Sequence, residues 1–113
     1  MPIMMGFAHQ RRRLLETELA RLVQELPPLG VLKAYLSGDF ALGQVGAETE
    51  LELVLVQATD EPFHRRADFF VSHLRPRIGT RFLVYTPEEF DALSGADRTL
   101  RQTVGVGELL FES

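Results

Sequence analysis

VLKAYLSGDFALGQVGAETELELVLV, residues 31–56, is the stretch that decides the fold. An apolar run stands at each end, and the loop between them opens with Ser37-Gly38-Asp39 and turns again at Gly43 and Gly46. The first run has no clean alternation of apolar and polar residues, which is typical of a strand buried on both faces. The pattern predicts two strands, and the short link between them favours antiparallel pairing.

The loop has the residues of a tight helical turn. Gly38 suits a backbone with positive φ or a close approach to another group. Asp39 is a good cap for a short helical turn that runs through Leu42, and Gly43 closes that turn. Backbone N–H groups at the start of such a turn can bind an anion.

Glu50 and Glu52 enter the second apolar run with one residue between them. Side chains alternate along a strand and each residue advances about 3.3 Å, so the two carboxylates point the same way about 6.6 Å apart. Carboxylates at that spacing can converge on a hard cation such as Mg²⁺. Without further context, a solvated strand edge is the more common explanation of this pattern.

The whole chain predicts one α/β domain over residues 1–113, with a mixed β-sheet and helices packed on it. Apolar periodicity predicts an amphipathic helix over 8–26, whose Arg11–Arg13 run we interpret as a solvated face. Further predicted helices begin near Asp60, at the capping box of Thr86-Pro87-Glu88-Glu89, and near Asp97. The predicted strands are 31–37, 50–57, 81–85 and 108–111. In the helix that follows Asp60, the residues predicted to be buried are Phe63, Ala67, Phe70, Val71 and Leu74.

The composition excludes several classes of protein. There is no cysteine, which rules out disulfides, thiolate zinc sites and a cysteine nucleophile. No apolar run of about 18 residues is present, so we expect no membrane span and a cytoplasmic protein of bacterial type. A net charge of −4 argues against a nucleic-acid partner, and binding of nucleic acid through a phosphate-binding patch at Arg11–Arg13 is a third hypothesis.

The central stretch resembles the minimal nucleotidyltransferases, small members of the DNA polymerase beta-like nucleotidyltransferase superfamily. Their signature is Gly-Ser-x-Ala-Arg-Gly, five residues, and Ser-Asp-x-Asp-Leu. Here Gly38-Asp39-Phe40-Ala41-Leu42-Gly43 and Thr49-Glu50-Leu51-Glu52-Leu53 keep that spacing, and the terminal GELLFES is also similar. The resemblance implies a nucleotidyltransferase fold, with nucleotide binding at Ser37, Gly38, Asp39 and Gly43. It also implies a Mg²⁺ site at Glu50 and Glu52, with Asp39 as a further candidate ligand.

The chemistry of the signature is altered. The family holds two metal ions with three carboxylates, and its spacing puts the third at Arg81, a residue that stays cationic. Asp39 replaces a phosphate-binding serine, and at about 4 Å and an effective dielectric near 20 its repulsion of a phosphate is of order 4 kcal/mol. Leu42 removes an arginine. These changes favour a catalytically degenerate domain that acts as a binding or regulatory partner, for a protein or as a homo-oligomer.

The alternative is an active Mg²⁺-dependent nucleotidyltransferase with Asp39, Glu50 and Glu52 as a relocated triad. It would move a nucleoside monophosphate from ATP or another nucleoside triphosphate to a hydroxyl of a protein or small molecule. We expect Mg²⁺ as a cofactor if the domain is active and no cofactor if it is degenerate.

Overall fold

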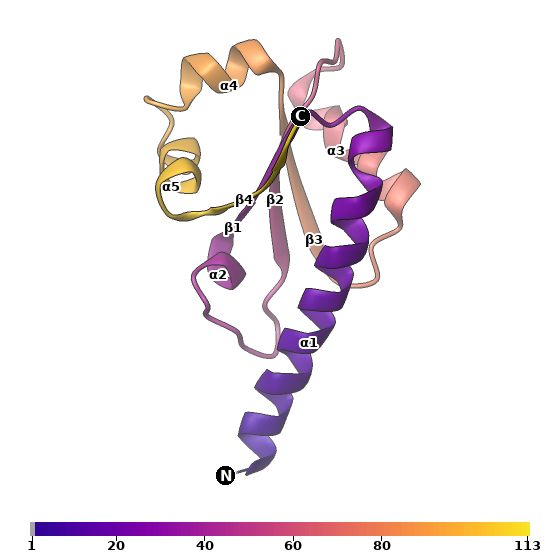
Figure 1. The fold of residues 1–113 in the computed structure, drawn as a ribbon, viewed down its shortest axis with the longest axis vertical. Helices are drawn as coiled ribbons and strands as arrows, with labels where there is room; N and C mark the ends of the chain where they lie inside the picture. Colours follow the sequence, from indigo (N-terminus) through magenta and orange to yellow (C-terminus); the bar gives the residue numbers. More distant parts are fainter. Residues whose placement is uncertain (1) are drawn as a thin grey trace.

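The fold is known from a computed structural model, which describes residues 2–113 apart from the side chains of residues 2–7 and 99. Helices and strands follow one another as expected for an α/β chain (Figure 1). In chain order they are α1 (Pro2–Glu25), the short 3-10 helix η1 (Pro27–Leu29), β1 (Lys33–Ser37), α2 (Gly38–Ala41), β2 (Leu51–Val56), α3 (Phe63–Leu74), β3 (Thr80–Tyr85), α4 (Pro87–Leu93), α5 (Arg98–Val106) and β4 (Glu108–Glu112).

The four described strands form one sheet in the order β3-β2-β1-β4. β1 pairs antiparallel with both β2 and β4, whereas β2 pairs parallel with β3. The helix α3 makes the crossover that a parallel pair requires. The predicted mixed sheet is therefore confirmed, including the antiparallel pairing of its first two strands.

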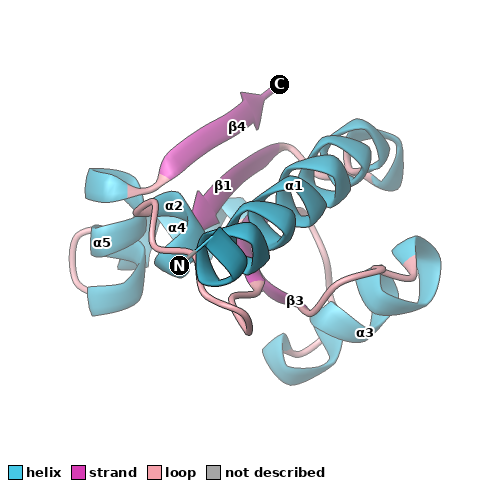
Figure 2. Ribbon diagram, turned by 90° about the horizontal axis from the view of Figure 1, so that it is seen from below, coloured by secondary structure: helices cyan, strands magenta, loops and turns pink. Residues whose placement is uncertain are grey.

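Helices cover both faces of the sheet (Figure 2). We call one side the α1/α3 face, where alternate strand residues such as Leu53 and Phe82 pack against Leu22 of α1 and Phe70 of α3. Phe70 and Phe82 stack with ring centroids 5.7 Å apart. This face carries most of the core, because its cluster holds more buried side chains than the cluster on the opposite face. Burial of each such side chain contributes about 1.5–3 kcal/mol.

The opposite side, the α4/α5 face, buries a smaller cluster. Tyr35 and Val54 lie under Phe90 of α4 and Leu100 of α5, and the rings of Tyr35 and Phe90 stack at 5.8 Å. This cluster involves the later parts of β2 and β3. The other end of this face, where β1 ends and β2 and β3 begin, carries polar side chains instead, and it forms the candidate site described below.

The helix α1 begins at Pro2, six residues before the predicted start at residue 8. Proline is tolerated in the first turn of a helix, so it gives no reason for a later start. Arg11 is not solvated as predicted, because its guanidinium donates to the carbonyl oxygen of Thr49 at 2.7 Å. Arg12 and Arg13 are exposed. No helix in residues 2–113 is both long and apolar enough to cross a bilayer.

The helix α3 differs from its prediction at its start and in its buried stripe. It begins at Phe63, after Pro62, and the acidic residues at 60 and 61 lie outside its first turn. Phe63 and Val71, predicted to be buried, are exposed. Arg66 is buried instead, because the guanidinium donates to the carbonyl oxygen of Val84 at the open edge of β3 and to Glu89.

Glu89 joins this buried arginine to the capping box of α4, which the structure confirms. Its carboxylate accepts from Arg66 Nη1 at 2.6 Å and from the backbone N–H of Thr86 at 2.9 Å. Hydrogen bonding from Arg66, followed by that from Thr86, lowers the pKa of Glu89 to about 2 from its ordinary 4.5. Both bonds stabilise the charged carboxylate, so the capping box and the α3–α4 contact depend on the same ionised group.

We predict that Glu89→Gln lowers the free energy of unfolding by about 1–2 kcal/mol at pH 7, a value reduced because solvent reaches this side chain. A depressed folded-state pKa contributes stability that is complete above about pH 4.5 and is lost as the pH falls through about 2. Urea unfolding from pH 7 to pH 2 should therefore show the difference between wild type and variant shrinking across that window.

Glu88→Gln is the matched control, because Glu88 is the preceding residue and is exposed. It should change stability by no more than about 0.5 kcal/mol. A loss in Glu89→Gln that stays constant down to pH 2 would contradict the role assigned to the charged carboxylate.

Candidate functional site

The site is built on one row of side chains across three strands. Ser37 of β1, Glu52 of β2 and Arg81 of β3 are register partners in the sheet. All three point to the α4/α5 face, since Glu52 lies two residues before Val54 on the same strand. The pairing places a hydroxyl, a carboxylate and a guanidinium side by side.

Glu52 is held from both sides of this row. Ser37 Oγ donates to Oε2 at 2.7 Å, and Arg81 Nη1 donates to Oε1 at 3.3 Å. The side chain of Glu52 is 24% exposed, whereas that of Arg81 is 69% exposed. The carboxylate therefore has a fixed position at the edge of the site, and most of the guanidinium extends into solvent.

The Gly38 turn lies directly over Glu52. Gly38 has φ +77°, and a Cβ at this position would stand 3.3 Å from Glu52 Cβ, so glycine satisfies both the backbone and the close approach. Asp39 is not the helix cap predicted from the sequence. Ser37 takes the N-cap position of α2, and Asp39 lies in its first turn.

Glu50 comes just before β2, which begins at Leu51 and not at the predicted Glu50. Its carboxylate lies against Gly79, so a Cβ at that position would require the Glu50 side chain to move. Glu50 and Glu52 nevertheless line one shallow hollow of about 290 Å³ together with Asp39 and Arg81. We call it the acidic hollow, since Glu48 adds a fourth carboxylate. Gly43 lies outside it, at the end of the α2 turn with φ +77°.

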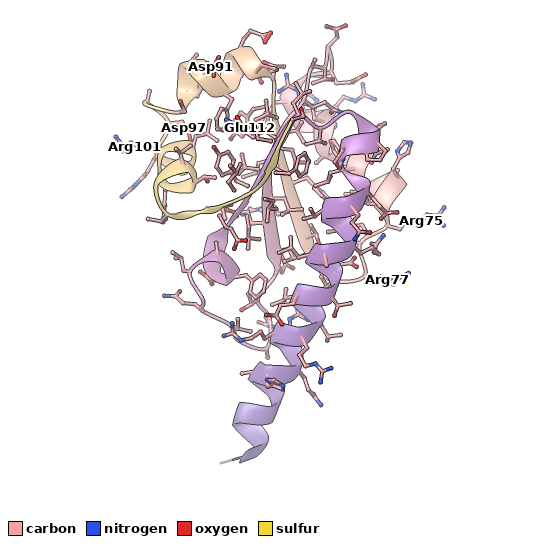
Figure 3. The ribbon with its side chains drawn as sticks, in the orientation of Figure 1. Arg75, Arg77, Asp91, Asp97, Arg101 and Glu112 are labelled. Carbon is pink, nitrogen blue, oxygen red and sulfur yellow. The ribbon has the colours of Figure 1, made fainter. Side chains whose placement is uncertain are left out.

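A larger cleft of about 400 Å³ adjoins the acidic hollow. The two share Gly38, Glu52 and Arg81 among their lining residues. Leu83 and Tyr85 of β3 line the cleft, and α5 contributes a wall that begins at Asp97. Figure 3 places Asp97 at the start of α5 and Arg101 on the outer side of that helix.

The sequence did not indicate Tyr85 or Asp97 as site residues. Burial, followed by the negative charges of Asp97, Glu89 and Glu52, raises the pKa of the Tyr85 hydroxyl above its ordinary value of 10.0. The signal for Tyr85 was its spacing of four from Arg81 on the same strand, which puts both side chains on one face. The position of Asp97 depends on how α5 packs, for which the sequence carried no comparable signal.

The arrangement does not fit a pair of divalent cations. Within the part of the chain that the structure describes, no three Asp, Glu, His or Cys residues lie close enough to hold one metal ion. Arg81 instead presents a guanidinium to Glu52, at the position where the resemblance would require a third carboxylate. Asp39, Glu50 and Glu52 share a hollow but do not form a metal-binding triad in this conformation.

Comparison with known proteins identifies the fold. No protein-family model matches the chain, and no curated protein matches it in sequence. Among solved structures, a predicted nucleotidyltransferase from Sulfolobus solfataricus superposes with a TM-score of 0.56 at 14% identity, over 96% of this chain and 86% of that one. A toxin–antitoxin structure determined with AMP-PNP gives a TM-score of 0.51 at 18% identity, over 87% and 73% of the two chains. The chain has a nucleotidyltransferase fold. The expected architecture is thereby confirmed, whereas activity does not follow from a likeness at this level of identity.

We predict that Arg81→Asp raises the affinity for Mg²⁺ at least tenfold. The change removes a cation that competes for Glu52 and adds an oxygen ligand of the kind that Mg²⁺ prefers. Isothermal titration calorimetry with MgCl₂ measures the gain directly, and the double variant Arg81→Asp/Glu52→Ala should lose it.

Arg101→Asp is the control for net charge, because Arg101 is exposed on the outer side of α5 (Figure 3). It makes the same change in total charge away from the site. Equal Mg²⁺ affinities for Arg81→Asp and Arg101→Asp would show that residue 81 is not at the metal-binding position.

Proposed function

We propose that this chain is a nucleotidyltransferase-fold domain that has lost efficient nucleotidyl transfer and serves as a binding domain for a protein partner. The observation that carries the proposal is that the register partner of Glu52 on β3 is Arg81 and not a carboxylate, with Arg81 Nη1 3.3 Å from Glu52 Oε1. This places a permanent cation beside the carboxylate that would otherwise be the natural metal ligand.

The surroundings of the Gly38 turn support the same proposal. Asp39 lines the acidic hollow with Glu48, Glu50 and Glu52, so four carboxylates stand where a triphosphate would have to lie. Their repulsion of phosphate is opposed within this hollow only by Arg81. A nucleoside triphosphate therefore meets repulsion in this hollow, whereas Mg²⁺ meets negative charge but finds a guanidinium where a third oxygen ligand would stand.

A protein partner is the kind of ligand suggested by one of the structural neighbours. That neighbour is described as a toxin–antitoxin, a description that names two components. A domain that keeps the fold while losing the catalytic ligands still offers the clefts on which a partner could bind. We place binding, and regulation of the bound protein, ahead of catalysis for this reason.

The second candidate function is Mg²⁺-dependent transfer of a nucleoside monophosphate to a protein or small-molecule hydroxyl. One observation favours it: Asp39, Glu50 and Glu52 line the same hollow. Side-chain rotation could bring the three carboxylates onto a shared cation, as in a relocated triad. Catalysis would then depend on all three residues.

We predict that incubation with each labelled nucleoside triphosphate, Mg²⁺ or Mn²⁺ and a lysate of the source organism gives no transfer that depends on Glu50 or Glu52. Every loss of 1.36 kcal/mol in stabilisation of the transition state costs tenfold in rate, and the metal ligand and both phosphate contacts are altered together. Label counted in the protein and small-molecule fractions measures the outcome.

The variant Asp39→Ser/Leu42→Arg/Arg81→Asp serves as the positive control, because it restores the serine and the arginine of the family signature and the third carboxylate, and keeps Glu50 and Glu52 as the other two. It should transfer label at least tenfold above wild type. Strong labelling by the wild-type chain that disappears in Glu52→Ala would instead establish the second candidate function.

A further inference from the structure

The cleft and the acidic hollow are two of three adjoining hollows, which together we call the groove. A third hollow of about 580 Å³ follows along the loop after α2, and it shares Asp39, Glu48 and Thr49 with the acidic hollow. Each hollow therefore adjoins the next through common lining residues. Three adjoining hollows suit an extended chain, which advances about 3.3 Å per residue and can place successive side chains in neighbouring hollows.

The two ends of this groove differ in chemistry. Three large apolar side chains stand around the cleft although they are about half exposed: Leu42 at 47%, Phe63 at 45% and Val106 at 55%. They come from the residue that ends the α2 turn, from α3 and from α5, so three separate segments direct apolar surface to one opening. Exposed apolar side chains that gather around a cleft are typical of a site that binds an apolar anchor.

The other end carries negative charge. Four carboxylates and one guanidinium line the acidic hollow, and Asp39 and Glu48 continue into the third hollow. The guanidinium of Arg81 pairs with Glu52, so it offsets the charge of that carboxylate and leaves the other three without a cation among the described residues that line the hollow. Charge complementarity therefore selects a cationic ligand at this end and disfavours a polyphosphate.

We infer that the groove binds an extended segment of a partner protein, in which an apolar residue is followed by lysine or arginine residues. The apolar residue fills the cleft between Phe63 and Val106, and the basic residues lie along the carboxylates of Asp39, Glu48 and Glu50. This inference rests on the proposed function, since it names the kind of partner that the domain binds. A second copy of this chain fits less well, because its own basic run lies within a helix, where Arg11 already contacts Thr49.

The inference is tested by fluorescence anisotropy with the full chain and three labelled nine-residue peptides. The first has one leucine followed by alternating arginine and glycine, the second has glutamate in place of arginine, and the third lacks the leucine. We expect the first peptide to bind at least tenfold more tightly than either of the others at 50 mM salt. Its affinity should fall as salt is raised, because the carboxylates are exposed.

Two matched pairs of variants locate the binding. Val106→Asn should weaken the first peptide at least fivefold and Val104→Asn less than twofold, since both valines are exposed on α5 but only Val106 lines the cleft. Glu48→Gln/Glu50→Gln should weaken it at least tenfold, whereas Glu16→Gln/Asp91→Asn, which removes the same charge from exposed positions elsewhere, should have less than a twofold effect.

Equal binding of the three peptides, absence of binding, or equal effects within either matched pair would overturn the inference. These results are distinguishable from failure of the proposed function, which is measured by transfer of label. A chain that binds the basic peptide at the groove and also transfers nucleotide would retain the groove assignment and refute the loss of catalysis.

Discussion

The site depends on the two hydrogen bonds that hold the carboxylate of Glu52 between Ser37 and Arg81. The register of β1, β2 and β3 sets these three residues side by side before any side chain rotates. The hydroxyl and the guanidinium then hold both carboxylate oxygens, and Gly38 closes over the Cβ of the same residue. A shift of one residue in the register of β2 would turn the side chain of Glu52 to the other face of the sheet and separate it from Ser37 and Arg81.

Much of this arrangement could be predicted from the sequence, because it follows from local spacing. The alternation of a strand places Glu50 and Glu52 on one side, and the distance from the capping box of Thr86 locates Arg81 on the neighbouring strand. The structure brings these residues and the Gly38 turn into one hollow. Where spacing is fixed by regular secondary structure, the geometry of a site can be inferred even when its residues have changed.

Other features depend on contacts between distant elements and could not be predicted in this way. Helical periodicity favours Phe63 and Val71 as buried residues of α3, but the open edge of β3 supplies a carbonyl oxygen that the guanidinium of Arg66 can reach. A buried arginine with a backbone acceptor and a carboxylate partner is stable where an unpaired one would not be. The cleft beside α5 could likewise not be predicted from local sequence patterns, because its shape depends on how that helix packs on the sheet.

The strength of the Arg81–Glu52 pair bears on the proposal that the site binds a metal ion poorly. An ion pair at 3.3 Å with one partner 69% exposed contributes only about 0–1 kcal/mol. A pair this weak would yield to a cation that had three good ligands, so the guanidinium alone does not exclude Mg²⁺. The larger deficit is the missing oxygen ligand at residue 81, since Mg²⁺ demands near-octahedral coordination and gives up its water reluctantly. Displacement of Arg81 would therefore restore little affinity for Mg²⁺, whereas a carboxylate in its place would restore the missing ligand.

By the same reasoning, the four carboxylates that repel a polyphosphate stay available to a cationic side chain. Such a side chain needs proximity to negative charge and no fixed coordination geometry.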